Sequence, residues 1–171
     1  MPTWDDYVNQ REQEREGFDL AQICENGHLI NKRARTESQY NKDYCSKCGK
    51  PTITTCPYCK GAIKGYDHAS KVIGLEFPIP SFCDNCGKPY PWISVKLEAA
   101  KDLINESNLN NSDKNIFSEN LGSILHESPK TSLAANRIRN VLSKAGKPIA
   151  EAFYKIFIDV SSETAKKILF P

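Results

Sequence analysis

The 171-residue sequence has no long apolar segment and few of the motifs that mark enzymes. No apolar run approaches the roughly 20 residues that cross a bilayer as a helix. The chain also lacks a glycine-rich phosphate loop, a nucleophile elbow and a His-Glu-x-x-His sequence. Its first residues are charged rather than apolar, so we expect no secretory signal peptide. These absences predict a cytoplasmic protein with no integral membrane segment and no catalytic activity.

Cysteine is absent outside residues 24–86, and inside that stretch all seven cysteines fall in close pairs, one of them completed by a histidine. The pairs are Cys24/His28, Cys45/Cys48, Cys56/Cys59 and Cys83/Cys86. A two-residue spacer lets both thiolates of a tight turn point at one ion, and tetrahedral zinc takes four ligands. The eight side chains therefore predict two structural zinc ions per chain.

Other uses of paired cysteines compete with zinc. Disulfides suit an oxidising compartment, but seven is an odd number. A thioredoxin-like redox pair suits a single Cys-x-x-Cys, yet four pairs without a strand–helix–strand pattern disfavour it. His28 follows a turn-forming Asn-Gly and is the nearest soft ligand to Cys24, so we predict that it completes that site. His68 and His126 have no incomplete pair to join, and we predict that they are not ligands.

The order of the pairs predicts how they share the ions. Sequential pairing puts Cys24, His28, Cys45 and Cys48 on one ion and Cys56, Cys59, Cys83 and Cys86 on the other. The loops inside the two sites are then 16 and 23 residues long, enough for a β-hairpin between two knuckles, which is the zinc-ribbon arrangement. Both predicted ribbons end in Cys-x-x-Cys-Gly-Lys-Pro, which favours this pairing. The interleaved alternative joins the first pair to the third, and spacing alone does not exclude it.

Several segments carry a resemblance to a known family. They are residues 23–31, 44–49, 55–59, 72–74 and 82–92 in the cysteine-rich part, and 131–135 and 159–169 in the tail. With these segments the chain resembles a bacterial family of uncharacterised double zinc-ribbon proteins with a helical C-terminal region. The resemblance covers most of the chain. It implies ribbons, zinc and a bacterial cytoplasm, and it implies no reaction.

The composition changes after Trp92, where cysteine ends and helical periodicity begins. We therefore predict an N-terminal helix over residues 1–17, a tandem zinc-ribbon domain over 18–92 and an α-helical region over 93–171. In the first ribbon, we expect one strand over 18–24 and its return over about 29–40. The predicted fold class is small, metal-dominated α+β.

The helical region is predicted to contain four helices separated by polar segments. Their ranges are 94–104, 113–126, 131–145 and 148–169, with residues 105–115 as a linker. The last helix carries an apolar stripe that includes Phe153 and Phe157. We expect these helices to pack on each other, on a second chain or on an outside protein, with the two phenylalanines as anchors.

These features predict a non-catalytic adaptor. Its ribbons would form a rigid recognition surface, and its amphipathic tail would bind a protein partner or a second copy. Lys32, Arg33 and Arg35, with Tyr40 and Tyr44 nearby, support the alternative of a nucleic-acid-binding module, because cations attract phosphates and bases stack on aromatic rings. A hydrolase or redox enzyme is a remote alternative.

Overall fold

A computed structural model describes residues 17–69 and 77–170 of the protein. The chain divides into two compact units, Met1–Trp92 and Ile93–Pro171. Short β-sheets lie in the first unit and helices in the second, so the predicted α+β class is confirmed. The helix predicted over residues 1–17 lies outside the described residues, apart from Gly17.

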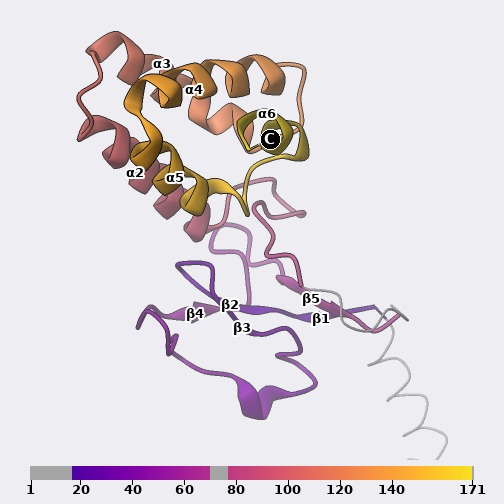
Figure 1. Ribbon diagram of the computed structural model, residues 1–171. Helices are drawn as coiled ribbons and strands as arrows, with labels where there is room; N and C mark the ends of the chain where they lie inside the picture. Colours follow the sequence, from indigo (N-terminus) through magenta and orange to yellow (C-terminus); the bar gives the residue numbers. More distant parts are fainter. Residues whose placement is uncertain (1–16, 70–76, 171) are drawn as a thin grey trace, which may run out of the picture. The chain divides into compact units, whose positions relative to one another are not determined.

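Two small antiparallel sheets form the first unit (Figure 1). The strands are β1 (Phe18–Leu20), β2 (Gln22–Cys24), β3 (Leu29–Asn31), β4 (Thr52–Ile53) and β5 (Lys64–Asp67). One sheet pairs β1 with β5, and the other has the order β3-β2-β4. Because the strands are only two to four residues long, the apolar surface that they can bury is small.

The single strand predicted over residues 18–24 is wrong in one respect, since the chain divides it between the two sheets. The interruption falls at Ala21, which is fully buried and whose N–H donates to the carbonyl of Ile63 at 2.9 Å. β1 therefore pairs with β5, while β2 continues into the sheet that contains Cys24. One short segment thereby connects both sheets of the unit.

The predicted return strand over about 29–40 is also shorter than expected. β3 ends at Asn31, whose side-chain oxygen accepts from the N–H of Arg33 at 2.9 Å. The amide nitrogen of Asn31 donates to the carbonyl of Glu37, also at 2.9 Å. An asparagine that bonds the backbone in this way favours turns over strand. The chain then continues through turns and a short 3-10 helix, η1 (Ser38–Tyr40).

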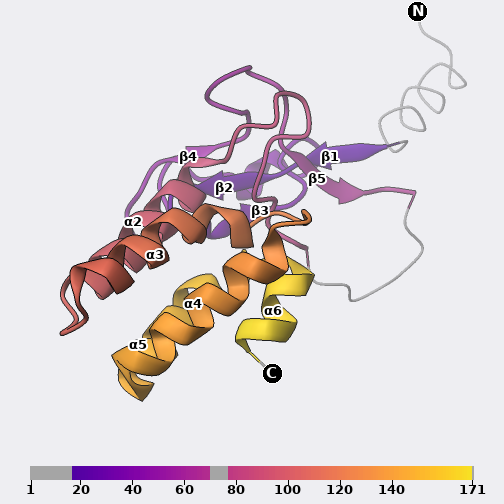
Figure 2. The ribbon, with the colours of Figure 1, turned by 90° about the horizontal axis from the view of Figure 1, so that it is seen from above.

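The second unit is a helical bundle in which α4 contacts α3, α5, α6 and η2 (Figures 1 and 2). Its elements are α2 (Pro91–Asn105), of which the first two residues belong to the first unit, α3 (Asn111–Leu121), η2 (Gly122–Ile124), α4 (Thr131–Ala145), α5 (Lys147–Phe157) and α6 (Glu163–Leu169). The rings of Phe117, Phe153 and Phe157 are fully buried in its core. Phe153 stacks on Phe157 with centroids 4.8 Å apart and meets Phe117 edge-on at 5.4 Å.

The helix predicted over residues 148–169 is two helices, α5 and α6. The side chain of Ser162 caps α6 by accepting from the N–H of Ala165 at 3.2 Å, and its own N–H donates to the carbonyl of Ile124 at 2.9 Å. A serine that caps a new helix and bonds a distant backbone group ends the continuous helical pattern. The break turns α6 back onto α4.

The predicted linker over residues 105–115 also proved too long. α3 begins inside it at Asn111, because the side chain of Asn110 accepts from the N–H of Asp113 at 2.8 Å and caps the helix. α3 ends at Leu121, earlier than the predicted 126, and continues as η2. Within residues 17–69 and 77–170, no helix combines the length and the apolar character needed to cross a membrane.

Candidate metal centres

The three Cys-x-x-Cys turns share one backbone hydrogen-bond pattern. In each, the first cysteine's N–H donates to the carbonyl five residues later, at 2.9 Å for Cys45, 2.8 Å for Cys56 and 2.9 Å for Cys83. The N–H four residues later donates back to that cysteine's carbonyl. The flanking residues form isolated bridges, namely Tyr44 with Pro51, Thr55 with Ala62 and Phe82 with Pro89. The sequence thus builds the same Cys-x-x-Cys knuckle three times.

Each knuckle closes on a residue with positive φ directly after its second cysteine. Gly49 and Gly87 have φ values of 70° and 72°, as glycine readily allows. In the remaining knuckle this position is Lys60, with a φ of 61°, a conformation that costs a non-glycine residue roughly 1–2 kcal/mol. The geometry of the knuckle therefore holds Lys60 at a positive φ despite this cost.

The first cluster joins one turn after β2 to the first Cys-x-x-Cys knuckle. It contains Cys24, His28, Cys45 and Cys48. The sulfur atoms of Cys24 and Cys48 are 3.7 Å apart. The Nδ1 atom of His28 lies 3.4 Å from the sulfur of Cys24 and 3.6 Å from that of Cys45. His28 therefore occupies the fourth corner of the group, as the sequence suggested.

The second cluster joins the other two knuckles. It contains Cys56, Cys59, Cys83 and Cys86. The sulfur atoms of Cys56 and Cys86 are 3.8 Å apart, and those of Cys59 and Cys83 are 3.7 Å apart. The grouping follows the sequential order of the pairs rather than the interleaved one. His68 and His126 belong to neither cluster.

The spacing of the ligand atoms fits a tetrahedral ion. In each cluster, all four atoms lie within 4.8 Å of one another. A tetrahedron with metal–sulfur bonds of about 2.3 Å places its sulfur atoms about 3.8 Å apart, and a nitrogen at about 2.05 Å lies about 3.6 Å from each sulfur. The observed separations agree with both values. Each cluster can therefore hold one metal ion with its four protein ligands alone.

Hydrogen bonds to sulfur favour the thiolate form of several cysteines, although burial outweighs them at Cys24 and raises the pKa of that thiol. The N–H of His28 donates to the sulfur of Cys24 at 3.2 Å, and that of Lys47 donates to the sulfur of Cys45 at 3.4 Å. In the second cluster, the side-chain amide of Asn85 donates to Cys59 at 3.3 Å. This bond, with a further one from the backbone N–H of Gly61, lowers the pKa of Cys59 to about 6.

Tyr90, which lies next to the second cluster, and Cys86, which belongs to it, have different surroundings. Tyr90 is buried and its side chain is hydrogen-bonded to Cys83; burial, followed by this bond, raises the pKa of the phenol, which remains a donor. Cys86 is the exposed cysteine of the cluster. The backbone N–H of Lys88 lowers the pKa of Cys86, but partial desolvation and the neighbouring cysteines outweigh it and raise that pKa to about 11.

Asn85 and Tyr90 are residues that sequence reasoning missed. Asn85 lies between the two cysteines of its knuckle, and such spacer residues can reach a sulfur of the partner knuckle only after the two knuckles meet. Tyr90 follows the Gly-Lys-Pro segment, and its burial depends on contacts distant in sequence. The repeated Cys-x-x-Cys-Gly-Lys-Pro marks neither position, since its first copy has Lys47 and Thr52 there.

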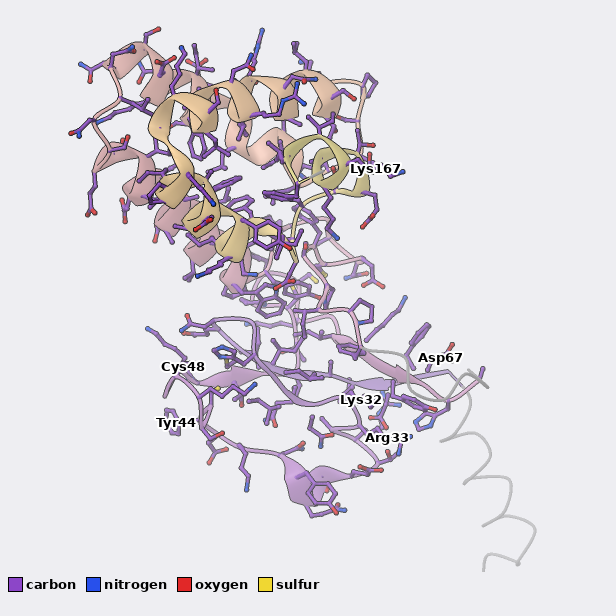
Figure 3. All side chains as sticks on the ribbon, in the orientation of Figure 1. Lys32, Arg33, Tyr44, Cys48, Asp67 and Lys167 are labelled. Atoms are coloured by element: carbon purple, nitrogen blue, oxygen red, sulfur yellow. The ribbon has the colours of Figure 1, made fainter. Side chains whose placement is uncertain are left out.

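The basic residues proposed for nucleic acid lie on the segment that follows β3. An Nη atom of Arg33 lies 2.8 Å from a carboxylate oxygen of Glu37, and its guanidinium carbon lies 4.2 Å from the centre of the Tyr66 ring. Lys32 lies 5.4 Å from the same ring. In Figure 3, Lys32 and Arg33 lie well apart from Tyr44 and Cys48 within the first unit. Part of the basic cluster is therefore used within the protein, and Tyr44 does not join it.

His68 has a structural partner in place of a metal. Its Nε2 atom lies 3.1 Å from a carboxylate oxygen of Asp19, whose side chain is completely buried. The same carboxylate accepts from the backbone N–H groups of Leu20 and Arg35 and from the hydroxyl of Thr36. Asp19 thereby ties β1, the segment after β3 and the end of β5 together.

These features define a small α+β protein with two Cys/His clusters that can each hold a metal ion. The family model described as "Uncharacterized protein conserved in bacteria (DUF2321)" matches residues 17–169, and the chain belongs to this family. Neither the curated proteins nor the solved structures include a significant match.

Proposed function

We propose that the protein is a non-catalytic zinc-binding adaptor. Two structural zinc ions would hold the first unit as a rigid recognition surface, and the helical unit would bind a protein partner or a second copy. The observation that carries the proposal is the complete set of four protein ligands in each cluster, all within 4.8 Å of one another. Structural zinc sites are closed by four such ligands.

Zinc is the metal that best suits the donor sets. One cluster combines three thiolates with an imidazole and the other has four thiolates, and both sets are typical of structural zinc. Iron also accepts tetrahedral sulfur ligands, so the metal content distinguishes the two. Structural zinc contributes on the order of 10 kcal/mol to folding, which compensates for strands only two to four residues long.

The closed ligand sets support the absence of catalysis at the metal. A catalytic zinc keeps one position for water or substrate, and neither cluster needs such a ligand to complete a tetrahedron. The zinc ions would then have a structural role and hold the chain in one conformation. The two short sheets and three knuckles form the surface that they hold.

A nucleic-acid-binding role is the weaker alternative. The metal-free chain has a formal net charge of +2, but binding two divalent ions through seven thiolates lowers it by three charges, to −1. Nucleic-acid affinity depends strongly on net positive charge at the contact surface. Arg33 is already paired with Glu37 and stacked on Tyr66. These two observations favour the adaptor over a nucleic-acid module.

Metal content and cobalt substitution test the proposal together. Protein purified without added metal should contain close to two equivalents of zinc by elemental analysis. With Co²⁺ in both sites, the absorption spectrum should show tetrahedral thiolate coordination and should not change when azide or thiocyanate is added, because no open position exists. One equivalent of zinc, iron in its place, or a spectrum that responds to these anions would overturn the proposal.

A further inference from the structure

A cavity of about 260 Å³ lies in the helical unit, where α4 ends and α5 begins. Leu142 and Ala150 contribute apolar surface from the two helices, and Leu169 and Phe170 close it from the end of α6. Arg139 and Lys147 lie in its wall. This volume is below the roughly 300–1,000 Å³ of pockets for drug-sized ligands and cofactors, so it suits a single large side chain.

The wall formed by the chain end is held in place by aromatic contacts. The ring of Phe170 meets the ring of Tyr154 edge-on, with centroids 4.9 Å apart. It also lies 6.2 Å from the ring of Phe153, which belongs to the buried core. The N–H of Phe170 donates to the carbonyl of Lys166 at 2.9 Å. The cavity is therefore preformed by packed residues and does not require a rearrangement of the bundle.

The charge around the cavity has one sign. The lining residues include two cations and no acidic side chain. Lys147 has an 86% exposed side chain and lies 3.7 Å from Glu151, an exposed ion pair of the kind that contributes little. Arg139 donates to the side-chain oxygen of Asn136 at 3.0 Å, which leaves its other N–H groups for a ligand. Both cations can therefore bind an anion.

We propose that this cavity binds an acidic peptide segment of a partner protein, with one apolar side chain in the cavity and carboxylates on Arg139 and Lys147. The inference rests on the proposed adaptor function and names the chemistry of its partner. An apolar floor favours an apolar anchor, and two neighbouring cations select carboxylates over basic or neutral sequences.

The test uses the full-length, zinc-loaded protein labelled with ¹⁵N. The probe is a blocked six-residue peptide with leucine and phenylalanine flanked by acidic residues, and its twin carries the corresponding amides. We expect saturable amide shifts confined to residues that line the cavity, weaker binding as salt is raised, and no comparable shifts with the amide twin. Equal binding of the twin, or shifts elsewhere, would overturn the proposal.

Charge-reversal variants sharpen the test. Arg139→Glu and Lys147→Glu should each weaken peptide binding by at least about fivefold, because each replaces an attraction by a repulsion. Lys155→Glu is the matched control, since Lys155 is exposed on the same helix as Lys147 and does not line the cavity; it should bind the peptide as the wild type does. Equal weakening by all three variants would show a diffuse charge effect and overturn the site.

Two further measurements separate this inference from the proposed function. Vesicles of phosphatidylglycerol that bind more tightly than the peptide and displace it would reassign the cavity to lipid and overturn the peptide proposal. Failure of every peptide to bind would also overturn it. Neither result affects the zinc content or the cobalt spectrum. Those two measurements test the metal-centred part of the proposed function.

Discussion

The indole of Trp92 stacks on the phenol of Tyr90, with ring centroids 4.6 Å apart and planes inclined by 17°. Both rings are fully buried. Tyr90 is hydrogen-bonded to Cys83 of the second cluster, and Trp92 packs against Gly27, which lies between two ligands of the first cluster. The stacked pair therefore connects the two clusters through side-chain contacts. Substitutions at this pair should destabilise both clusters.

Removal of the indole should destabilise the first unit without changing any ligand. Trp92→Ala deletes a fully buried ring and the hydrogen bond from its Nε1 atom to the carbonyl of Pro80, at 2.9 Å. Substitutions of this type cost about 3–5 kcal/mol. Denaturant unfolding of the zinc-loaded protein should show this loss. Trp92→Phe, which keeps a stacking ring, should lose less, and an equal loss in both variants would contradict the role of the stack.

The close approach at Gly27 gives a second prediction. Its φ is 85°, and a Cβ atom at this position would lie 3.0 Å from the Cβ of Trp92. Gly27→Ala should therefore destabilise the unit by about 1–3 kcal/mol through strain and overpacking. Gly122→Ala is the control, because no atom lies within 4 Å of its added Cβ and its φ is −64°. A similar cost for both changes, measured by denaturant unfolding, would contradict this explanation.

The metal clusters could be predicted from the sequence because their information is local. The two-residue spacers limit the possible ligands before any fold is known. So does the absence of a second cysteine close to Cys24, which leaves His28 as its nearest partner. The division of the predicted strand at Ala21 and the break before Ser162 could not be predicted in this way. Each depends on a backbone bond to a distant residue, Ile63 in one case and Ile124 in the other. The local periodicity of the sequence does not predict such distant hydrogen-bond partners.

The helical unit should lose its fold when its aromatic core is made polar. Phe153 and Phe157 are fully buried and stacked on each other. Replacing both with Ser removes two rings, at about 3–5 kcal/mol each, and buries two hydroxyl groups, which together approach the whole stability of a small domain. Circular dichroism should show the loss of helix, while elemental analysis should still find two zinc ions. Release of metal would show that the units do not fold separately.

Asp19 should stabilise the first unit as a buried carboxylate. Its four hydrogen-bond donors outweigh the desolvation that opposes ionisation, and its pKa is lowered below 3.8. Asp19→Asn should cost about 1–3 kcal/mol at pH 7, because one of the two accepting oxygens becomes an NH₂ group, which cannot accept from the donors that face it. Asp43→Asn, at an exposed aspartate, is the control and should change stability little.

The sign of the pH dependence follows from the lowered pKa of Asp19. A depressed folded-state pKa means that the carboxylate contributes its full stability above the unfolded value of about 3.9 and loses it as the pH falls through the folded-state pKa. The gap in unfolding free energy between the wild type and Asp19→Asn should therefore persist from pH 8 down to about pH 5. A gap that disappears between pH 7 and pH 5 would contradict an ionised Asp19.

The two metal clusters should differ in their reactivity toward electrophiles. Cys86 is exposed, whereas Cys24 and Cys45 of the first cluster are buried and Cys48 is only partly accessible. Alkylation turns a zinc-bound thiolate into a neutral thioether, a much weaker ligand, and the ion then leaves. We expect N-ethylmaleimide in molar excess over the cysteines to modify Cys86 first and to release one equivalent of zinc, followed by the second equivalent at a slower rate. Peptide mass spectrometry with a colorimetric zinc indicator measures both events. Cys86→Ser should retain the slow phase and lose the fast one, whereas simultaneous release of both ions, or first modification at Cys24, would show that exposure at Cys86 does not control access to the metal.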